Sequence, residues 1–227
     1  DEFILDRSDA YIGVLIDDLV TEGTNEPYRM MTSRCEYRLT MRQDNADLRL
    51  SKKGHDLGLV SDERYQKMLD KRAMIDGEIE RLKKIMLTPK ETTNKALEDL
   101  SSTPINKGVT LYELIKRPEI TYEATEVFDP ERVKLPSFIK MSVQTEIKYE
   151  GYIKKQMADI EKFKKLESKK LSHDIDYEKI PGLKKESAEK LNKIKPDSLG
   201  QASRISGVSP ADVNVLLIRL KTGELYG

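Results

Sequence analysis

The sequence predicts a mainly α-helical fold, with long helices and a small helical bundle at its C-terminal end. Three observations favour this fold class. Apolar residues recur at helical spacing along most of the 227 residues. Helix-start signals precede many of these stretches. Charged residues make up 35% of the chain, against a usual share of about 25%, which suits long solvated helices around narrow cores.

The N-terminal part of the chain predicts two helices. Ser8 can cap the first, whose apolar side chains recur at i, i+3, i+4 and i+7 from Ile12 to Leu19. Ser33 and Glu36 have capping-box spacing, so we expect residues 34–42 to be helical. Strict alternation of apolar residues between positions 37 and 41 leaves a strand open as the alternative.

From residue 51 onward the sequence predicts only helices and connectors. Ser61 begins a long helix that runs to about Leu87. Thr110 and Glu113 form a capping box for a short helix over 111–116. Three prolines within 118–137 predict a connector with little regular structure.

The C-terminal part predicts a second long helix, from about Ser142 to Leu171, with lysines on its outer faces. A turn at Pro181 and Gly182 follows, and then three short helices over 185–194, 198–205 and 210–221. Ser209 and Pro210 are a strong start signal for the last one. We see no internal repeat in the sequence.

Composition excludes several classes of protein. Forty basic and 40 acidic residues give zero net charge, which excludes a simple polycation that coats nucleic acid. The balance is an average, because residues 1–27 hold eight acids and one base while 28–55 hold seven bases and three acids. No apolar run approaches the roughly 18 residues of a membrane span, and no signal peptide is visible. A single cysteine permits no internal disulfide, so we expect a cytoplasmic protein.

Motifs for catalysis, cofactors and metals are absent from the sequence. It contains neither a G-x-G-x-x-G nor a P-loop motif, and two distant histidines with one cysteine make a poor metal site. We therefore predict no catalytic, cofactor-binding or metal-binding residue. Cys35 is interpreted as a small helix residue, although Arg34 and Arg38 nearby would favour a thiolate.

Two basic surfaces stand out. On a helix, Arg34, Arg38 and Arg42 would form one stripe, flanked by Arg29 and Arg49. The repulsion between these like charges must be compensated by negative groups nearby. Three interpretations are open: internal salt bridges, phosphate or nucleic-acid contact, and contact between domains. The second surface is the lysine-rich long helix, interpreted either as a phosphate-backbone contact or as an ordinary solvated face. Its candidate residues are Lys148, Tyr149, Tyr152, Lys154, Lys155 and Lys162.

Five stretches of the chain are long motifs that together span nearly its whole length. They are DRSDAYIGVLIDDLV at 6–20, PYRMMTSRCEYRL at 27–39, RQDNADLRL at 42–50, IKYEGYI at 147–153 and LGQASRISGVSPAD at 199–212. In sequence and in order they resemble the GidA/MnmG family, the tRNA uridine 5-carboxymethylaminomethyl modification enzymes, also called glucose-inhibited division protein A. Cys35 stands where the family more often has alanine, so it is not a family catalytic cysteine.

The resemblance implies a place in a larger enzyme. Such proteins combine a Rossmann-type FAD domain, an inserted NADH domain and a C-terminal helical domain. With a GTPase partner, MnmE, they modify carbon 5 of the wobble uridine of tRNA, using FAD, NADH and a folate-carried one-carbon unit. We expect residues 1–50 to be the tail of the FAD domain, 51–140 a helical subdomain with an irregular connector, and 141–227 a C-terminal helical subdomain. The full-length protein is expected to be a homodimer.

The resemblance also implies what this chain does and lacks. We expect it to bind tRNA and the GTPase partner, to bind no FAD and to have no turnover by itself. Arg29, Arg34, Arg38, Arg42 and Arg49 become candidates for tRNA or interdomain contact. Arg204 joins the lysine helix as a candidate for tRNA or partner contact. The alternative is a protein-interaction module that binds the GTPase without touching tRNA.

Overall fold

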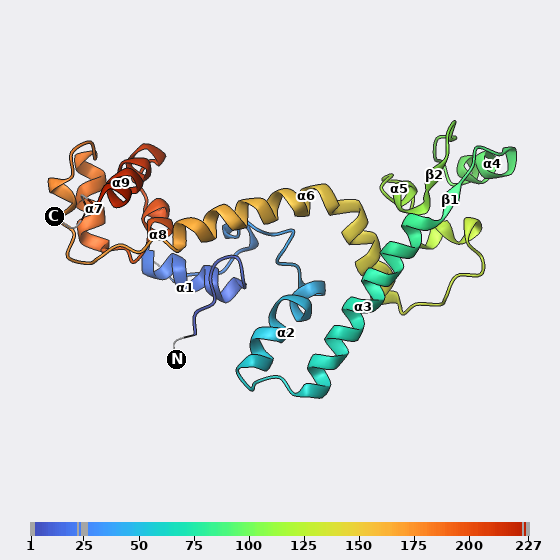
Figure 1. Ribbon diagram of the computed structural model, residues 1–227, viewed down its shortest axis with the longest axis horizontal. Helices are drawn as coiled ribbons and strands as arrows, with labels where there is room; N and C mark the ends of the chain where they lie inside the picture. Colours follow the sequence, from blue (N-terminus) through green and yellow to red (C-terminus); the bar gives the residue numbers. More distant parts are fainter. Residues whose placement is uncertain (1–2, 22, 24–26, 224, 226–227) are drawn as a thin grey trace. The chain divides into compact units, whose positions relative to one another are not determined.

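The computed structural model describes residues 3–21, 23, 27–223 and 225, and it is mainly helical (Figure 1). The predicted fold class is confirmed. The α-helices are α1 (Tyr11–Thr21), α2 (Ala46–Asp56), α3 (Asp62–Lys84), α4 (Glu91–Asp99), α5 (Leu111–Ile115), α6 (Ser137–Glu167), α7 (Lys185–Ile194), α8 (Leu199–Arg204) and α9 (Pro210–Thr222). Short 3-10 helices cover Thr32–Arg34, Gln43–Asn45, Glu123–Phe128 and Tyr177–Lys179.

The chain divides into two compact units. Unit 1 combines residues 1–41 with 156–227, and unit 2 comprises residues 42–155. The boundary on the C-terminal side falls within α6, so this helix contributes residues to both cores.

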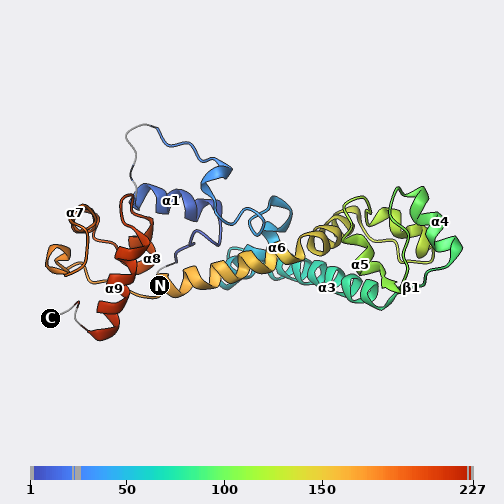
Figure 2. The same cartoon turned by 90° about the horizontal axis from the view of Figure 1, so that it is seen from above.

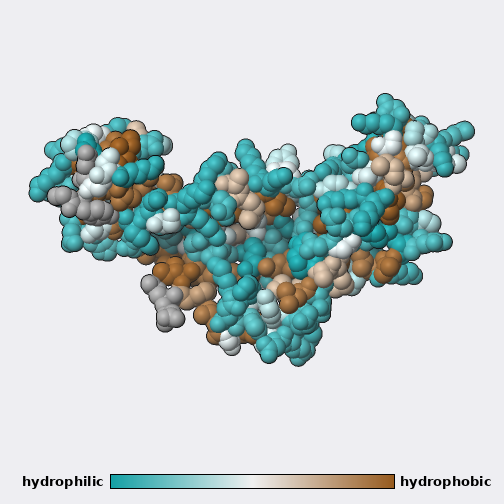
Figure 3. All heavy atoms as spheres, in the orientation of Figure 1, coloured by the Kyte–Doolittle hydropathy of each residue, from teal (hydrophilic) through white to brown (hydrophobic). Residues whose placement is uncertain are grey.

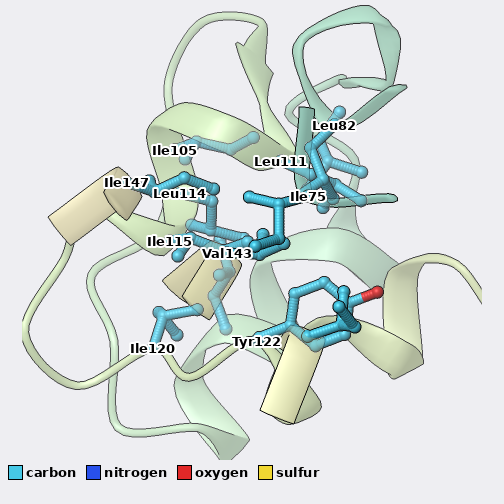
Figure 4. Close-up of a cluster of buried hydrophobic side chains, with 13 residues drawn as sticks. Ile75, Leu82, Ile105, Leu111, Leu114, Ile115, Ile120, Tyr122, Val143 and Ile147 are labelled. Atoms are coloured by element: carbon cyan, nitrogen blue, oxygen red, sulfur yellow. The ribbon is translucent and has the colours of Figure 1, made fainter. Parts of the chain in front are cut away.

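The core of unit 2 is built by α3, α5 and the first half of α6. Figure 4 shows Leu82 of α3 beside Leu111 of α5, and Ile75 of α3 beside Val143 of α6, and all four are fully buried. These positions recur at helical spacing, so each helix presents one apolar stripe to its neighbours. Burying each such side chain contributes about 1.5–3 kcal/mol to the free energy of folding.

A small antiparallel pair of strands corrects the expectation of only helices after residue 51. β1 (Met86–Leu87) pairs with β2 (Val109–Thr110), with Leu87 opposite Val109. The long helix therefore ends at Lys84 instead of Leu87. The pairing leads directly into α5, where the predicted Thr110–Glu113 capping box is confirmed. Ser61 is likewise confirmed as the cap of α3.

A buried polar group anchors the connector between α5 and α6. The Tyr122 hydroxyl, on a side chain that is 1% exposed, donates a 2.7 Å hydrogen bond to Glu78 of α3. Arg81 donates two hydrogen bonds to the same carboxylate. Arg132 donates to the Tyr122 carbonyl and lies over its ring. Side-chain contacts of Tyr122 and Arg132 thus fix the position of the connector. Its regular structure is one 3-10 helix, Glu123–Phe128.

The predicted helix over residues 34–42 is wrong, and so is the alternative strand. A 3-10 turn covers Thr32–Arg34 and further turns follow it. Cys35, Tyr37 and Met41 are all buried in the core of unit 1. The Gln156 side chain on α6 bonds the Thr40 N–H at 2.9 Å and the Glu36 carbonyl at 3.2 Å. Packing against α6 therefore overrides the local capping signal.

Two serines that resemble helix caps have other roles. Ser142 lies inside α6, which begins five residues earlier at Ser137, and its hydroxyl donates to the Phe138 carbonyl. Ser8 lies before α1, which begins at Tyr11, and its hydroxyl donates to Asp6. Serine can bond to nearby carbonyl groups within a helix as well as cap one, so the residue type alone did not fix these boundaries. The end of α6 lies at Glu167 instead of Leu171.

The C-terminal bundle contains a structural repeat that our sequence interpretation missed. Ile180–Leu183 precedes α7 and Ile205–Val208 precedes α9, 25 residues later, and α7, α8 and α9 cluster together in both views (Figures 1 and 2). Gly182 and Gly207 have φ of +96° and +95°. The turn N–H of Leu183 bonds the Ile180 carbonyl, and that of Val208 bonds the Ile205 carbonyl. The repeated Ile-x-Gly-Leu/Val pattern was the available signal.

Candidate functional site

Arg7 is the centre of a buried ion-pair network in unit 1 that sequence reasoning did not find. Its side chain is only 7% exposed. Its guanidinium forms ion pairs with Asp17, at 3.0 Å, and with Asp18. Two of its nitrogens also donate hydrogen bonds to the two carboxylate oxygens of Glu36, at 3.1 and 3.2 Å. The available signal was a pair of aspartates at positions 17 and 18 inside an otherwise apolar helix.

The charges of this network hold one another in the ionised state. Burial alone would lower the pKa of Arg7, but its hydrogen bond to Asp18 and the charges of Glu36 and Asp17 raise it. Burial alone would raise the pKa of Asp18, but hydrogen bonds from Tyr28 and Arg7 and the charges of Arg7 and Arg34 hold it below its usual range. Breaking a buried pair of this kind leaves an uncompensated charge, so the network is structural.

Arg204 of α8 is placed in the same network. Its guanidinium bonds both carboxylate oxygens of Asp17, at 2.6 and 2.7 Å, and one oxygen of Glu167 at 2.5 Å. It also lies over the Phe163 ring, 5.0 Å from the centroid. The side chain is therefore occupied by contacts within unit 1, which tie α8 to α1 and to the end of α6.

The other candidate arginines do not form one stripe. Arg34 lies over the Tyr28 ring and 3.4 Å from Asp18, whereas Arg29 and Arg38 are exposed. Arg42 and Arg49 belong to unit 2, where Arg42 pairs with Asp44 at 3.0 Å and Arg49 bonds Asn45 at 3.1 Å. The proposed stripe required an α-helix over 34–42, which this segment does not form.

Cys35 is buried in the core of unit 1 and does not lie in a helix. Burial, reinforced by the charge of Glu36, raises the pKa of its thiol, and the nearby arginines do not reverse this. The alternative of a thiolate favoured by Arg34 and Arg38 is therefore wrong. A buried thiol with a raised pKa is a poor nucleophile.

The outer surface of α6 in unit 2 exposes two neighbouring tyrosines. Tyr149 is 44% exposed and Tyr152 is 67% exposed, and their ring centroids are 6.5 Å apart at an interplanar angle of 56°. Lys154 and Lys155 follow on the same helix, are exposed, and have no ion pair within the described part of unit 2. Tyr149, Tyr152 and Lys155 recur at i and i+3 along α6, so they are neighbours on one exposed face of this helix.

Of the remaining lysine candidates, Lys148 is held by the protein itself and Lys162 is not. Lys148 donates to the carbonyl oxygens of Arg117 and Pro118, at 3.1 and 2.8 Å, which fastens α6 to the connector. Lys162 belongs to unit 1, is exposed, and lies 3.2 Å from Asp159. An exposed pair of this kind contributes little and leaves the lysine available for other partners.

In the part of the chain that the structure describes there is no strand, glycine-rich turn and helix in succession of the dinucleotide-binding type. Binding units for FAD or NADH place a glycine-rich turn between a strand and a helix. Here β2 runs into α5 without an intervening glycine, and β1 is followed by Pro89. Among the described residues there is also no group of three potential metal ligands, and no helix is long and apolar enough to cross a membrane.

Each unit contains a cavity among its described residues. The larger, about 530 Å³, lies in unit 2 between α2, α3 and the start of α6, beside Met68 and Phe138. The smaller, about 240 Å³, lies in unit 1 beside Arg7, Asp17 and Arg204. Four of the charged residues lining the smaller one, Arg7, Asp17, Glu167 and Arg204, belong to the ion-pair network, so they already have partners.

Comparisons with known proteins identify the family to which the chain belongs. Residues 62–157 match the tRNA modifying enzyme MnmG/GidA C-terminal helical domain, and residues 159–225 match the corresponding C-terminal helical bundle. A tRNA uridine 5-carboxymethylaminomethyl modification enzyme MnmG of Finegoldia magna is 66% identical over 97% of this chain and 35% of its own length. The MnmG of Caldicellulosiruptor saccharolyticus is 62% identical over the same shares.

A solved structure leads to the same family. The structure of Aquifex aeolicus GidA in the form II crystal superimposes with a TM-score of 0.77 and is 40% identical, over 96% of this chain and 34% of that one. The chain spans about a third of the length of the curated relatives it matches. It belongs to the MnmG/GidA family of tRNA-modifying enzymes and corresponds to their C-terminal helical portion.

Proposed function

We propose that this chain is the tRNA- and partner-binding portion of a flavin-dependent enzyme that modifies carbon 5 of the wobble uridine of tRNA. The observation that carries the proposal is the exposed Tyr149–Tyr152 pair on α6, with the exposed Lys155 three residues after Tyr152 on the same helix. In the wider protein, FAD and NADH would supply the redox chemistry. The role of this chain is to hold RNA and the GTPase partner.

The chemistry of this α6 surface suits unpaired nucleotides. Every base has a π-face that stacks on an aromatic ring, and such stacking contributes about 1–3 kcal/mol per base. Two exposed tyrosines at i and i+3 are neighbours on the helix surface, and Lys155, at i+3 from Tyr152, can contact a backbone phosphate. An ordinary solvated helix face has no need of two large exposed rings.

We also propose that residues 1–50 are the tail of the flavin domain. Support comes from α1, where Ile12, Ile16, Leu19 and Val20 are all exposed, and Figure 3 shows apolar atoms at the surface of this region. Contiguous apolar surface of this kind marks a contact with another protein part. The exposed side chains suit a larger domain that packs on this helix.

A tRNA-binding assay tests the role of the tyrosine pair. We expect the double variant Tyr149→Ala/Tyr152→Ala to bind labelled tRNA more weakly, by about 1–3 kcal/mol for each stacked base, in fluorescence anisotropy. The matched control is Tyr149→Phe/Tyr152→Phe, which keeps both rings and should keep the affinity. Because both side chains are exposed, neither variant should change the unfolding free energy by more than about 0.5 kcal/mol.

The tRNA-binding assay, together with a binding assay for the GTPase partner, addresses the alternative function. If the unaltered chain binds no tRNA at low salt but still binds the GTPase partner, the chain is a protein-interaction module. If the alanine variant binds tRNA as tightly as the phenylalanine variant, the tyrosine pair is not a stacking surface.

A further inference from the structure

The repeat in the C-terminal bundle supplies an internal comparison between two copies of one local fold. A methyl group added at Gly182 would contact Val215, and one added at Gly207 would contact Lys190, which is the counterpart of Val215. The buried Ser187 of the first copy bonds its own counterpart, Asp212, at 2.9 Å. Each copy's turn glycine therefore faces the same position on the other copy's helix, and corresponding positions lie 25 residues apart.

The two copies differ strongly in charge. Residues 184–195 carry five lysines against two glutamates, whereas residues 209–220 carry one arginine and one aspartate. None of the five lysines has a charged counterpart. The pairs are Lys184 with Ser209, Lys185 with Pro210, Lys190 with Val215, Lys193 with Ile218, and Lys195 with Leu220. Because the second copy forms the same turn and helix without these lysines, the fold itself does not require them.

Three of the lysines make no side-chain hydrogen bond within the described part of unit 1. Lys195 donates to the Ile175 carbonyl, and Lys190 lies 2.7 Å from Glu186, so these two are used locally. Lys184 and Lys193 are exposed, with no ion pair in the described part of unit 1. Lys185 is exposed and its nearest carboxylate, Glu189, is 3.9 Å away.

We propose that the first copy of the repeat, and not the second, contacts the phosphate backbone of RNA through Lys184, Lys185 and Lys193. Lysines of this kind bind a polyanion by releasing its counterions, without reading the base sequence. Glu186 and Glu189 reduce the local charge, but segment 184–195 keeps three more cations than anions. The inference rests on the proposed tRNA-binding function and adds a second contact in unit 1.

The test is a salt series of tRNA binding by the full 227-residue chain, measured by anisotropy of labelled tRNA between about 0.05 and 0.2 M salt. The variant is Lys184→Gln/Lys185→Gln/Lys193→Gln. Each lost phosphate contact should weaken binding about eightfold at about 0.1 M salt and reduce the log–log salt slope by about 0.9, or about 0.7 for a single strand. Loss of all three contacts corresponds to about 500-fold at that salt concentration.

The matched control removes three exposed lysines from unit 2, as Lys90→Gln/Lys95→Gln/Lys107→Gln. It makes the same change in net charge and should leave affinity and slope within about twofold of the parent. Circular dichroism and the thermal midpoint should match the parent for both variants, because the mutated side chains are exposed.

Distinct outcomes separate this inference from the function on which it rests. A weaker, less salt-dependent complex for the α7 variant alone supports the inference. If that variant binds tRNA like the parent, the inference is wrong and the tRNA-binding function stands; the lysines then serve solubility or an acidic protein. Equal losses in both variants indicate a bulk charge effect and overturn the inference. If the parent binds no tRNA, both proposals are wrong.

Discussion

Replacing Arg204 with alanine tests whether this side chain is structural. The change removes two hydrogen bonds to Asp17 and one to Glu167. Removing one partner of a buried ion pair costs about 3–5 kcal/mol when the other is left uncompensated. Here Asp17 keeps Arg7, and Glu167 keeps the Ser198 hydroxyl, so the loss is smaller. We expect the free energy of unfolding of unit 1 to fall by about 2–4 kcal/mol.

Urea unfolding and hydrogen exchange measure this effect. Protection should fall at the amides of α1, α8 and the end of α6, because Arg204 joins these three elements, and amides of unit 2 should be unaffected. Arg29→Ala is the control, since Arg29 is exposed, and it should change stability by less than about 0.5 kcal/mol. An Arg204→Ala chain with unchanged stability and weaker tRNA binding would refute the structural assignment and restore Arg204 as an RNA contact.

Two further predictions concern acid stability and the cofactor. Asp212 is 2% exposed and accepts hydrogen bonds from the Ser187 and Ser209 hydroxyls and from the N–H groups of Ser209 and Lys184. Burial alone would raise the pKa of this carboxyl, but the hydrogen bonds lower it from 3.8 to about 2. A lowered pKa stabilises the fold above about pH 4, and this contribution, about 2 kcal/mol, is lost as the pH falls towards 2. Asp212→Asn should be less stable at neutral pH and lose that part of the acid dependence in urea titrations; an unchanged dependence would contradict the assignment. The purified chain should show no flavin absorbance, because it lacks a glycine-rich dinucleotide motif, and a stoichiometric flavin spectrum would disprove this.

Local signals predicted the helices well where capping and periodicity agreed. Ser61 before α3, the Thr110–Glu113 box before α5 and Ser209–Pro210 before α9 each place a side-chain oxygen near unpaired N–H groups at the helix start. Such interactions span only three or four residues, so they are visible in the sequence. The family is visible there too, because its motifs are contiguous runs of seven to fifteen residues, such as IKYEGYI at 147–153.

Local signals failed where distant residues compete for the same backbone. The Ser33–Glu36 pattern did not form a helix because Gln156, more than a hundred residues away, bonds the backbone of that segment. The Arg34, Arg38 and Arg42 stripe was lost with the helix. A side chain and a backbone group so far apart in sequence leave no periodic signal.

The candidate site divides in the same way. Sequence alone determined that α6 carries tyrosines and lysines, and that the chain is helical and belongs to a tRNA-modifying family. Only the tertiary structure decided which cations face solvent: Lys154 and Lys155 are exposed, whereas Arg7 and Arg204 are occupied by Asp17. Charge is a property of the residue type, but its availability depends on which carboxylates the fold brings within hydrogen-bond distance, and that is set by long-range packing.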